Sequence, residues 1–203
     1  MSKLLVCILL LSFSVCFGAN KKATDDYRSL VQRAKVGDQT VNFRDLRFAY
    51  MDSEDYEKGS DTEAQKKTMW AALKEHNFKD AVTNADAVLA GDYADIDAHF
   101  VEYVSHRELK EAELSDLHHS IFQGLLRSIT DSGDGKTPET AFQVIEVHEE
   151  YVVLRAMGVS FPKSQSLMKK GGHSYDAVTF EDQGTHKDVT LYFNVDIPAK
   201  HAL

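Results

Sequence analysis

The stretch D-S-G-D-G-K-T-P-E-T, residues 131–140, separates two kinds of sequence. Its glycines, its proline and its short polar side chains favour turns over regular structure. Before it, apolar residues recur every three or four positions, which is the period of a helix. After it, β-branched and aromatic residues occur in short runs, which is typical of strands. The sequence therefore predicts an α+β protein: helices come first, and a C-terminal β unit occupies residues 133–203.

Residues 63–132 are the most regular part and predict antiparallel helical hairpins with short connections. One helix begins near Asn77 and places Ala81 and Ala85 on the face that meets its neighbour. Small side chains at successive contacts allow two helices to approach closely. We expect the next helix to begin at Asp95, and a longer one to run from residue 110 to residue 130.

The spacing of Phe78, Ala81, Ala85 and Leu89 resembles the second helix of a tetratricopeptide repeat. A helix that begins at Asp95 would follow at the distance expected of the next repeat. A generic helical hairpin with small residues in its seam explains the same pattern. The middle of the chain is therefore described as tetratricopeptide-like, with both interpretations open.

Residues 19–62 predict N-terminal helices followed by an acidic loop. Asn42 is expected to cap a short helix, because an asparagine side chain can accept hydrogen bonds from the first backbone N–H groups. The acidic, turn-like run D-S-E-D-Y-E-K-G-S-D-T at residues 52–62 then predicts a loop.

The C-terminal part predicts a four-stranded, mostly antiparallel sheet. Its signals are two hairpin-type turns, K-G-G and Q-G-T, between runs rich in strand-forming residues. Residues 149–157 fit either a helix or a strand, and the acids at their start with Gly158 at their end favour a helix. The expected strands are A-F-Q-V-I-E-V (141–147), 164–169, 174–181 and 188–196.

The first 18 residues predict a cleavable signal peptide. An apolar run from Leu4 to Val15 is too short to span a bilayer, and the small residues Cys16 and Gly18 suit a signal peptidase. We therefore expect a chain that begins at Ala19 and is exported to the periplasm or the extracellular space. Both cysteines lie in the expected signal, so the remaining chain has no thiol.

The net negative charge of the chain indicates which classes of partner it disfavours. The full chain has a formal net charge of −9, and loss of Lys3 with the signal would make it −10. Such a charge repels phosphate backbones and anionic lipid surfaces, which argues against nucleic acid as a partner. No stretch beyond the signal predicts a transmembrane segment. A protein or peptide partner fits better, and the sequence leaves the oligomeric state open.

Catalytic motifs do not stand out. The chain lacks the G-x-S-x-G and H-E-x-x-H patterns, and the adjacent His118 and His119 point about 100° apart on a helix. We expect no catalytic residue, no metal ligand set and no cofactor. The alternative is an envelope-directed hydrolase with carboxylates and histidines between the helical and β parts.

Four motifs, in order from residue 41 to residue 196, resemble a family of exported bacterial proteins of unknown function. The resemblance implies an exported protein with a repeat-like helical middle and a C-terminal β unit, and it carries over no catalytic residue. The motifs are V-N-F-R-D-L-R-F-A-Y (41–50), G-D-G-K-T-P-E-T-A-F-Q-V-I (133–145), E-E-Y-V-V-L-R-A-M-G (149–158) and T-L-Y-F-N-V-D (190–196).

The favoured function is a non-catalytic protein- or peptide-binding or scaffold module of the cell envelope. In a repeat-like stack the first helix of each hairpin lines the concave side, where polar groups can grip an extended peptide. Asp97 and His99 are the expected binding residues on the helix that begins at Asp95. Arg47 and Tyr50 are expected to lie beside them.

Overall fold

The computed structural model of the chain describes residues 12–57, 62–159 and 161–201. Of the expected signal peptide, residues 1–11 therefore lie outside the described part, and the first helix begins at Ser12. Among the described helices, none is both long enough and apolar enough to cross a membrane.

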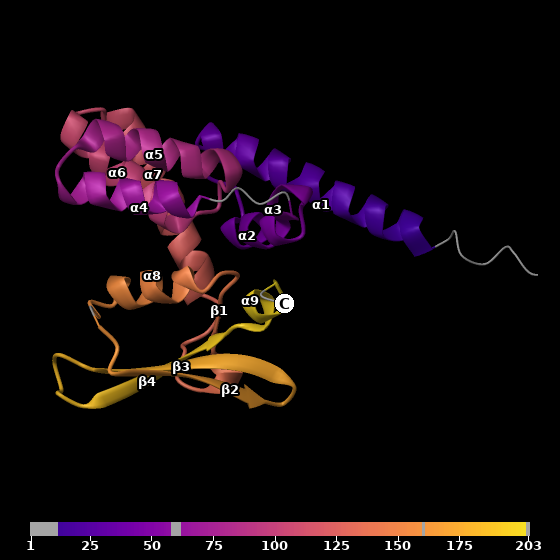
Figure 1. Ribbon diagram of the computed structural model, residues 1–203, viewed down its shortest axis with the longest axis vertical. Helices are drawn as coiled ribbons and strands as arrows, with labels where there is room; N and C mark the ends of the chain where they lie inside the picture. The colour runs from indigo at the N-terminus through magenta and orange to yellow at the C-terminus, as the bar shows by residue number, and fades with distance from the viewer. Residues whose placement is uncertain (1–11, 58–61, 160, 202–203) are drawn as a thin grey trace, which may run out of the picture.

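The helical part precedes the sheet in the chain, as the sequence predicts (Figure 1). A short helix forms inside the stretch that was expected to be an acidic loop. The helices of this part are α1 (Ser12–Lys35), α2 (Phe43–Met51), α3 (Glu54–Glu57), α4 (Glu63–Lys74), α5 (Phe78–Gly91), α6 (Ile96–Leu109) and α7 (Ala112–Thr130).

The predicted α+β class and the four-stranded sheet are confirmed. The strand order is β1-β4-β3-β2, in which β1 is parallel to β4 and the other pairs are antiparallel. The elements of this part are a 3₁₀ turn η1 (Pro138–Thr140), β1 (Phe142–Gln143), α8 (His148–Ala156), β2 (Ser164–Lys170), β3 (His173–Glu181), β4 (Asp188–Asn194) and α9 (Asp196–His201).

Two predictions about this part have different outcomes. The helix favoured for residues 149–157 is confirmed as α8. The strand expected over residues 141–147 is wrong in length, because β1 ends at Gln143. The backbone N–H of Ile145 donates to the Glu149 side chain at 2.8 Å instead of to a neighbouring strand, and the chain turns into α8.

The turn between β2 and β3 follows the predicted hairpin chemistry. Gly171 and Gly172 have φ angles of +59° and +87°. Two successive positive φ angles match the right-handed twist of the strands that they join, and glycine adopts them without steric penalty.

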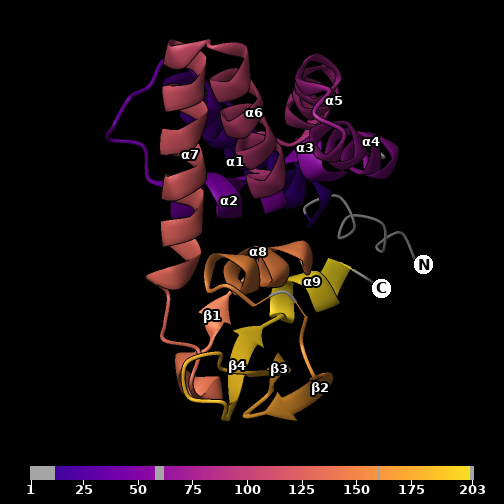
Figure 2. The ribbon, with the colours of Figure 1, turned by 90° about the vertical axis from the view of Figure 1, so that its left-hand side faces the viewer.

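The molecule has a helical layer and a sheet layer, with α8 and α9 between them (Figures 1 and 2). Figure 2 shows that α7 is long enough to run from the top of the helical layer down to the sheet part. Buried apolar side chains from both layers form one continuous core, among them Leu46 of α2, Ile129 of α7, Val153 of α8 and Phe193 of β4. The two layers are therefore packed as one unit around α8.

Candidate functional site

Helix α2 presents different side chains to solvent and to the interior. The side chain of Asn42 caps it, since its Oδ1 accepts hydrogen bonds from the backbone N–H groups of Arg44 and Asp45 at 3.0 and 3.3 Å. The helical period places Arg47 and Tyr50 on the buried side, whereas Arg44 is exposed.

Arg47 lies beneath the surface and joins α2 to α8. It is 1% exposed and forms a two-pronged ion pair with Glu149, with Nε–Oε1 and Nη2–Oε2 distances of 2.7 and 2.5 Å. Its guanidinium also donates to Ser128 Oγ and to the carbonyl oxygen of Gln143, both at 3.1 Å. The planar guanidinium of Arg47 thus donates hydrogen bonds to three different elements, α7, β1 and α8.

A surface groove of about 600 Å³ lies between α2 and α7. Ser128 and Gln143, which Arg47 holds from below, line it. Its lining is rich in amides, hydroxyls and guanidinium groups: Gln39, Val41, Asn42, Phe43, Arg44, Ser120, Gly124, Arg127, Ser128, Asp131, Ser132 and Gln143.

Two cations of the groove have no acidic partner among the described residues. Arg44 and Arg127 are exposed, and neither forms an ion pair within the described part of the chain. Arg44 stacks on the ring of Phe48 at 4.5 Å, and Arg127 donates to the carbonyl oxygen of Gln123. In an acidic chain, these cations form a local site that suits a carboxylate or another anion.

A second polar cluster lies where α4 and the loop before α6 meet the segment that leads into α8. Lys66 Nζ is 2.7 Å from Asp95 Oδ2, and His148 Nδ1 is 3.0 Å from Glu146 Oε2. His148 Nε2 lies 4.0 Å from the same Asp95 oxygen and so links the two pairs. We call Lys66, Asp92, Asp95, Glu146 and His148 the junction cluster.

The pKa values of the junction cluster diverge. Burial, followed by the charges of Glu146 and Asp95, raises the pKa of Asp92 well above its usual range. Burial alone would lower the pKa of His148, but the hydrogen bond to Glu146 and the charge of Asp95 outweigh it and raise the pKa to about 10. Burial opposes the lowered pKa of Asp95, which the charges of His148 and Lys66 produce. An acid whose pKa is raised therefore lies beside two carboxylates, Asp95 and Glu146, whose pKa values are lowered.

The four residues that the sequence predicts for binding lie in different surroundings. Arg47 and Tyr50 are buried, at 1% and 5% exposed, and His99 is completely buried. Asp97 is half-buried and pairs with Arg155 of α8, whose guanidinium also lies 5.4 Å from the centre of the Trp70 ring. The structure does not bring the four side chains together on one surface, and their role in binding stays a prediction.

Tyr50 belongs to an aromatic group rather than to the groove. Its ring centre is 5.3 Å from that of Tyr27 and 5.5 Å from that of Tyr56. Burial raises the pKa of the Tyr50 hydroxyl, and the charges of Asp92 and Glu146 raise it further. Tyr50 thus borders the junction cluster.

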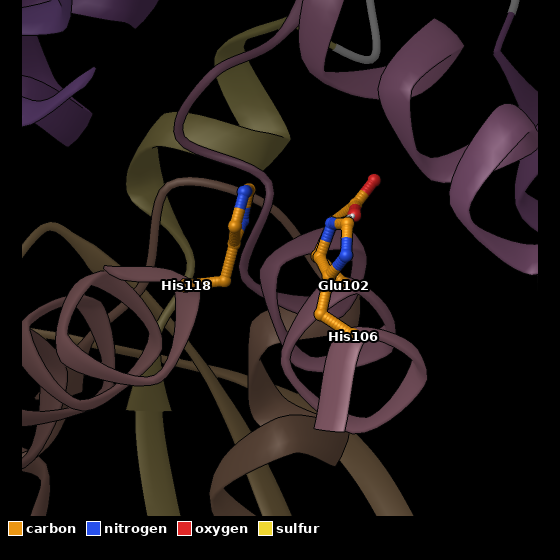
Figure 3. A group of neighbouring side chains, drawn as sticks. All are labelled: Glu102, His106 and His118. Atoms are coloured by element: carbon orange, nitrogen blue, oxygen red, sulfur yellow. Dashed lines mark ion pairs between the residues drawn. The ribbon is translucent and has the colours of Figure 1, made fainter. Parts of the chain in front are cut away.

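His99 leads to a third polar cluster, inside the α6–α7 pair. Its Nδ1 is 3.0 Å from Nδ1 of His118, and its Nε2 is 3.0 Å from the carbonyl oxygen of Tyr93. Glu102 and His106 lie near His118, and Figure 3 shows them side by side on α6 with His118 on the neighbouring α7.

The sequence contains one local pattern that points to this third cluster, the spacing of Glu102 and His106. The adjacent pair His118 and His119 does not reveal it. Glu102 and His106 stand four residues apart, so they share one face of α6. Only the packing of α7 against α6 adds His118 to them. The junction cluster has no comparable local pattern, because its members come from α4, the α5–α6 loop, the segment before α8 and the first residue of α8.

Comparisons with known proteins give a family and no function. A family model described as a domain of unknown function (DUF4919) matches residues 19–202. No curated protein and no solved structure matches the chain.

Proposed function

The chain belongs to the DUF4919 family of domains of unknown function, and we propose that it is an exported, non-catalytic module of the cell envelope that binds a protein or peptide in the α2–α7 groove. Export is proposed because the first 18 residues have the apolar run and small residues of a signal peptide. The family match begins at Ala19, the residue after the proposed cleavage point. The envelope is one destination of such a chain.

The groove is the observation that carries the binding proposal. Peptide recognition needs donors and acceptors for the peptide backbone, together with a charged group that fixes its orientation. The groove offers amides and hydroxyls for the backbone, and Arg44 and Arg127 for a carboxylate. Arg47 supports its floor from below, so this buried residue acts on binding through Ser128 and Gln143.

The helical layer supports a scaffold role. Helices α4 to α7 follow one another as closely packed neighbours, with short connections. The small residues Ala81 and Ala85 of α5 are completely buried, which agrees with a close seam between neighbouring helices. We propose that this layer is tetratricopeptide-like and holds the groove rigid.

A peptide selection tests the binding proposal. A display library of random peptides is selected against the chain without residues 1–18, and the enriched peptides are measured by fluorescence anisotropy. We expect peptides rich in Asp, Glu or a free C-terminal carboxylate. The variant Arg44→Ala/Arg127→Ala is expected to bind them at least tenfold more weakly, because it removes both cations of the groove.

The matched control is Lys79→Ala/Arg107→Ala, which removes two exposed cations outside the groove and is expected to bind as the unmodified chain does. The proposal fails if no peptide is enriched, or if both double variants lose affinity equally. An equal loss would show that binding follows net charge rather than the groove.

The junction cluster favours a second candidate, an envelope-directed hydrolase. A carboxyl group that keeps its proton at neutral pH can act as a general acid, and a neighbouring carboxylate–imidazole pair can orient or accept a proton. Asp92 would be the acid, and Glu146 with His148 the pair. These side chains lie between the helical layer and α8.

The second candidate is tested with p-nitrophenyl esters, p-nitrophenyl glycosides and isolated cell-wall glycan. If the chain is a hydrolase, one of these is turned over and Asp92→Asn removes the activity. Asp86→Asn, an exposed aspartate of α5, serves as the control and keeps it. Rates that Asp92→Asn does not change would eliminate this candidate.

A further inference from the structure

The third polar cluster has the composition of a metal site. Glu102 and His106 lie four residues apart on α6, and His118 faces them from α7. One potential ligand atom of each lies within 4.8 Å of the other two (Figure 3). The three residues are 0%, 6% and 9% exposed, respectively. A set of two imidazoles and one carboxylate is thus held between two packed helices.

Glu102 is a buried carboxyl group that has few partners among the described residues. Among the described residues, neither of its carboxylate oxygens accepts a hydrogen bond, and its ionic contact is with His106 Nε2, which lies 2.8 Å from Oε2. A buried carboxylate is unfavourable unless a proton or a cation neutralises it.

The contact with Glu111 sets the tautomer of a neutral His106. Its Nδ1 lies 2.6 Å from Glu111 Oε2, and an ionised carboxylate can only accept, so Nδ1 carries the proton. In a neutral ring Nε2 then has a lone pair, and this lone pair points at the Glu102 carboxylate. Two acceptor atoms 2.8 Å apart require a proton or a metal ion between them.

A chain of hydrogen bonds sets the tautomer of His118 in the same way. The carbonyl oxygen of Tyr93 can only accept, so His99 Nε2 donates to it. With its proton on Nε2, a neutral His99 accepts the proton of His118 at its own Nδ1. The lone pair of His118 is then on Nε2.

We propose that Glu102, His106 and His118 bind a divalent transition-metal ion, with zinc the best match, through one carboxylate oxygen and two imidazole Nε2 atoms. Imidazole nitrogens favour zinc and its neighbours in the first transition series over calcium and magnesium, which prefer oxygen ligands. The combination of two histidines and a glutamate is a known three-ligand set for tetrahedral zinc, and it leaves the fourth position to another ligand.

The surrounding residues complete the arrangement that such a site requires. Glu111 orients His106, and His99 orients His118, which are the outer hydrogen bonds that fix ligand tautomers in metal sites. The Glu111 side chain is 50% exposed at the α6–α7 turn and marks the side from which an ion can enter. A bound ion would join α6 to α7. This proposal differs from the expectation from the sequence, which is that the chain has no metal ligand set.

Zinc alone is the probe for the test. The chain without residues 1–18 is freed of metal with a chelator, and Zn²⁺ is titrated in competition with a chromophoric chelator. We expect one equivalent to bind, and Co²⁺ in its place to give the intense visible absorption of a tetrahedral site. The melting temperature is expected to rise by several degrees with Zn²⁺, since the ion binds the folded state.

Variants separate a ligand role from a structural one. Glu102→Gln removes the buried charge without changing side-chain size, so we expect a folded metal-free protein with an equal or higher melting temperature. We also expect Glu102→Gln and His118→Ala to reduce zinc affinity at least a hundredfold. His119→Ala is the matched control, because His119 stacks on Tyr103 with ring centres 4.5 Å apart and is outside the cluster.

The proposal is overturned if the unmodified chain binds no stoichiometric zinc, if Glu102→Gln retains its affinity while folded, or if His119→Ala weakens binding as much as His118→Ala does. His106→Ala adds a further check: it should abolish the Co²⁺ absorption, and a retained spectrum counts against the site.

Discussion

At the scale of single residues, Arg47 is a buried charge that joins α2 to α8. It is 1% exposed and is neutralised by Glu149, which is 2% exposed. Arg47→Met is expected to lower the free energy of unfolding by about 3–5 kcal/mol, because the Glu149 carboxylate would remain buried without its partner. Urea denaturation followed by circular dichroism measures the loss.

The double variant Arg47→Met/Glu149→Gln is the control for this explanation. Without a buried carboxylate, most of the lost stability should return, because the amide oxygen of the substituted side chain can still accept from the backbone N–H of Ile145. If the double variant is as unstable as Arg47→Met, the unpaired charge is not the cause of the loss.

Glu150 gives the molecule a predictable dependence on pH. Burial and then the charge of Asp176 raise its pKa from 4.5 to about 8. The folded protein therefore holds this proton more tightly than the unfolded chain does, and stability falls as the pH rises from about 4.5 to about 8. Glu150→Gln should remove this dependence on pH. As the pH rises through that range, the free energy of unfolding of the variant should therefore increase relative to that of the unmodified chain, by at most about 1.4 kcal/mol per pH unit.

Urea denaturation at pH 5 and pH 8.5 measures the effect. Glu113→Gln, at an exposed position of α7, is the control. Its free energy of unfolding should differ from that of the unmodified chain by the same small amount at pH 5 and at pH 8.5. A difference for Glu150→Gln that does not grow with pH would contradict the prediction.

At the scale of elements, Gly124 decides how closely α2 approaches α7. A Cβ atom at this position would lie 2.2 Å from the ring of Phe43, which is shorter than any van der Waals contact. Gly124→Ala should therefore destabilise the protein by about 1–2 kcal/mol, the overpacking strain less the helix propensity that alanine adds.

Removal of the ring should reverse the sign. In a Phe43→Ala background, Gly124→Ala is expected to stabilise by up to about 1 kcal/mol, because only the helix propensity remains. A double-mutant cycle measured by thermal denaturation shows the coupling. Additive effects of the two substitutions would mean that Phe43 moves aside without cost.

At the scale of the whole molecule, the export proposal predicts the N-terminal residue of the mature protein. The exported protein should begin at Ala19, since Cys16 and Gly18 suit a signal peptidase. Mass spectrometry of the protein from the cell envelope or the medium measures its mass and its first residue. Retention of residues 1–18, or a lipid on Cys16, would refute this prediction.

The order of elements could be predicted because its signals are local. Helical periodicity marks the helices from α4 to α7, and the capping residues Asn42 and Asp95 mark where α2 and α6 begin. Two glycines mark the β2–β3 turn through the positive φ angles that they accept. These signals need no knowledge of distant residues, so the sequence by itself determined the α+β class and most element boundaries.

The contacts that form the polar clusters were decided only by the tertiary structure. Arg47 and Glu149 are 102 positions apart, and the local sequence around either residue does not predict its partner. The same is true of His118 and its partners on α6, which meet because two apolar helix faces pack together. A polar side chain shows in sequence that it can donate or accept, whereas its partner is chosen by the burial of the apolar residues around it.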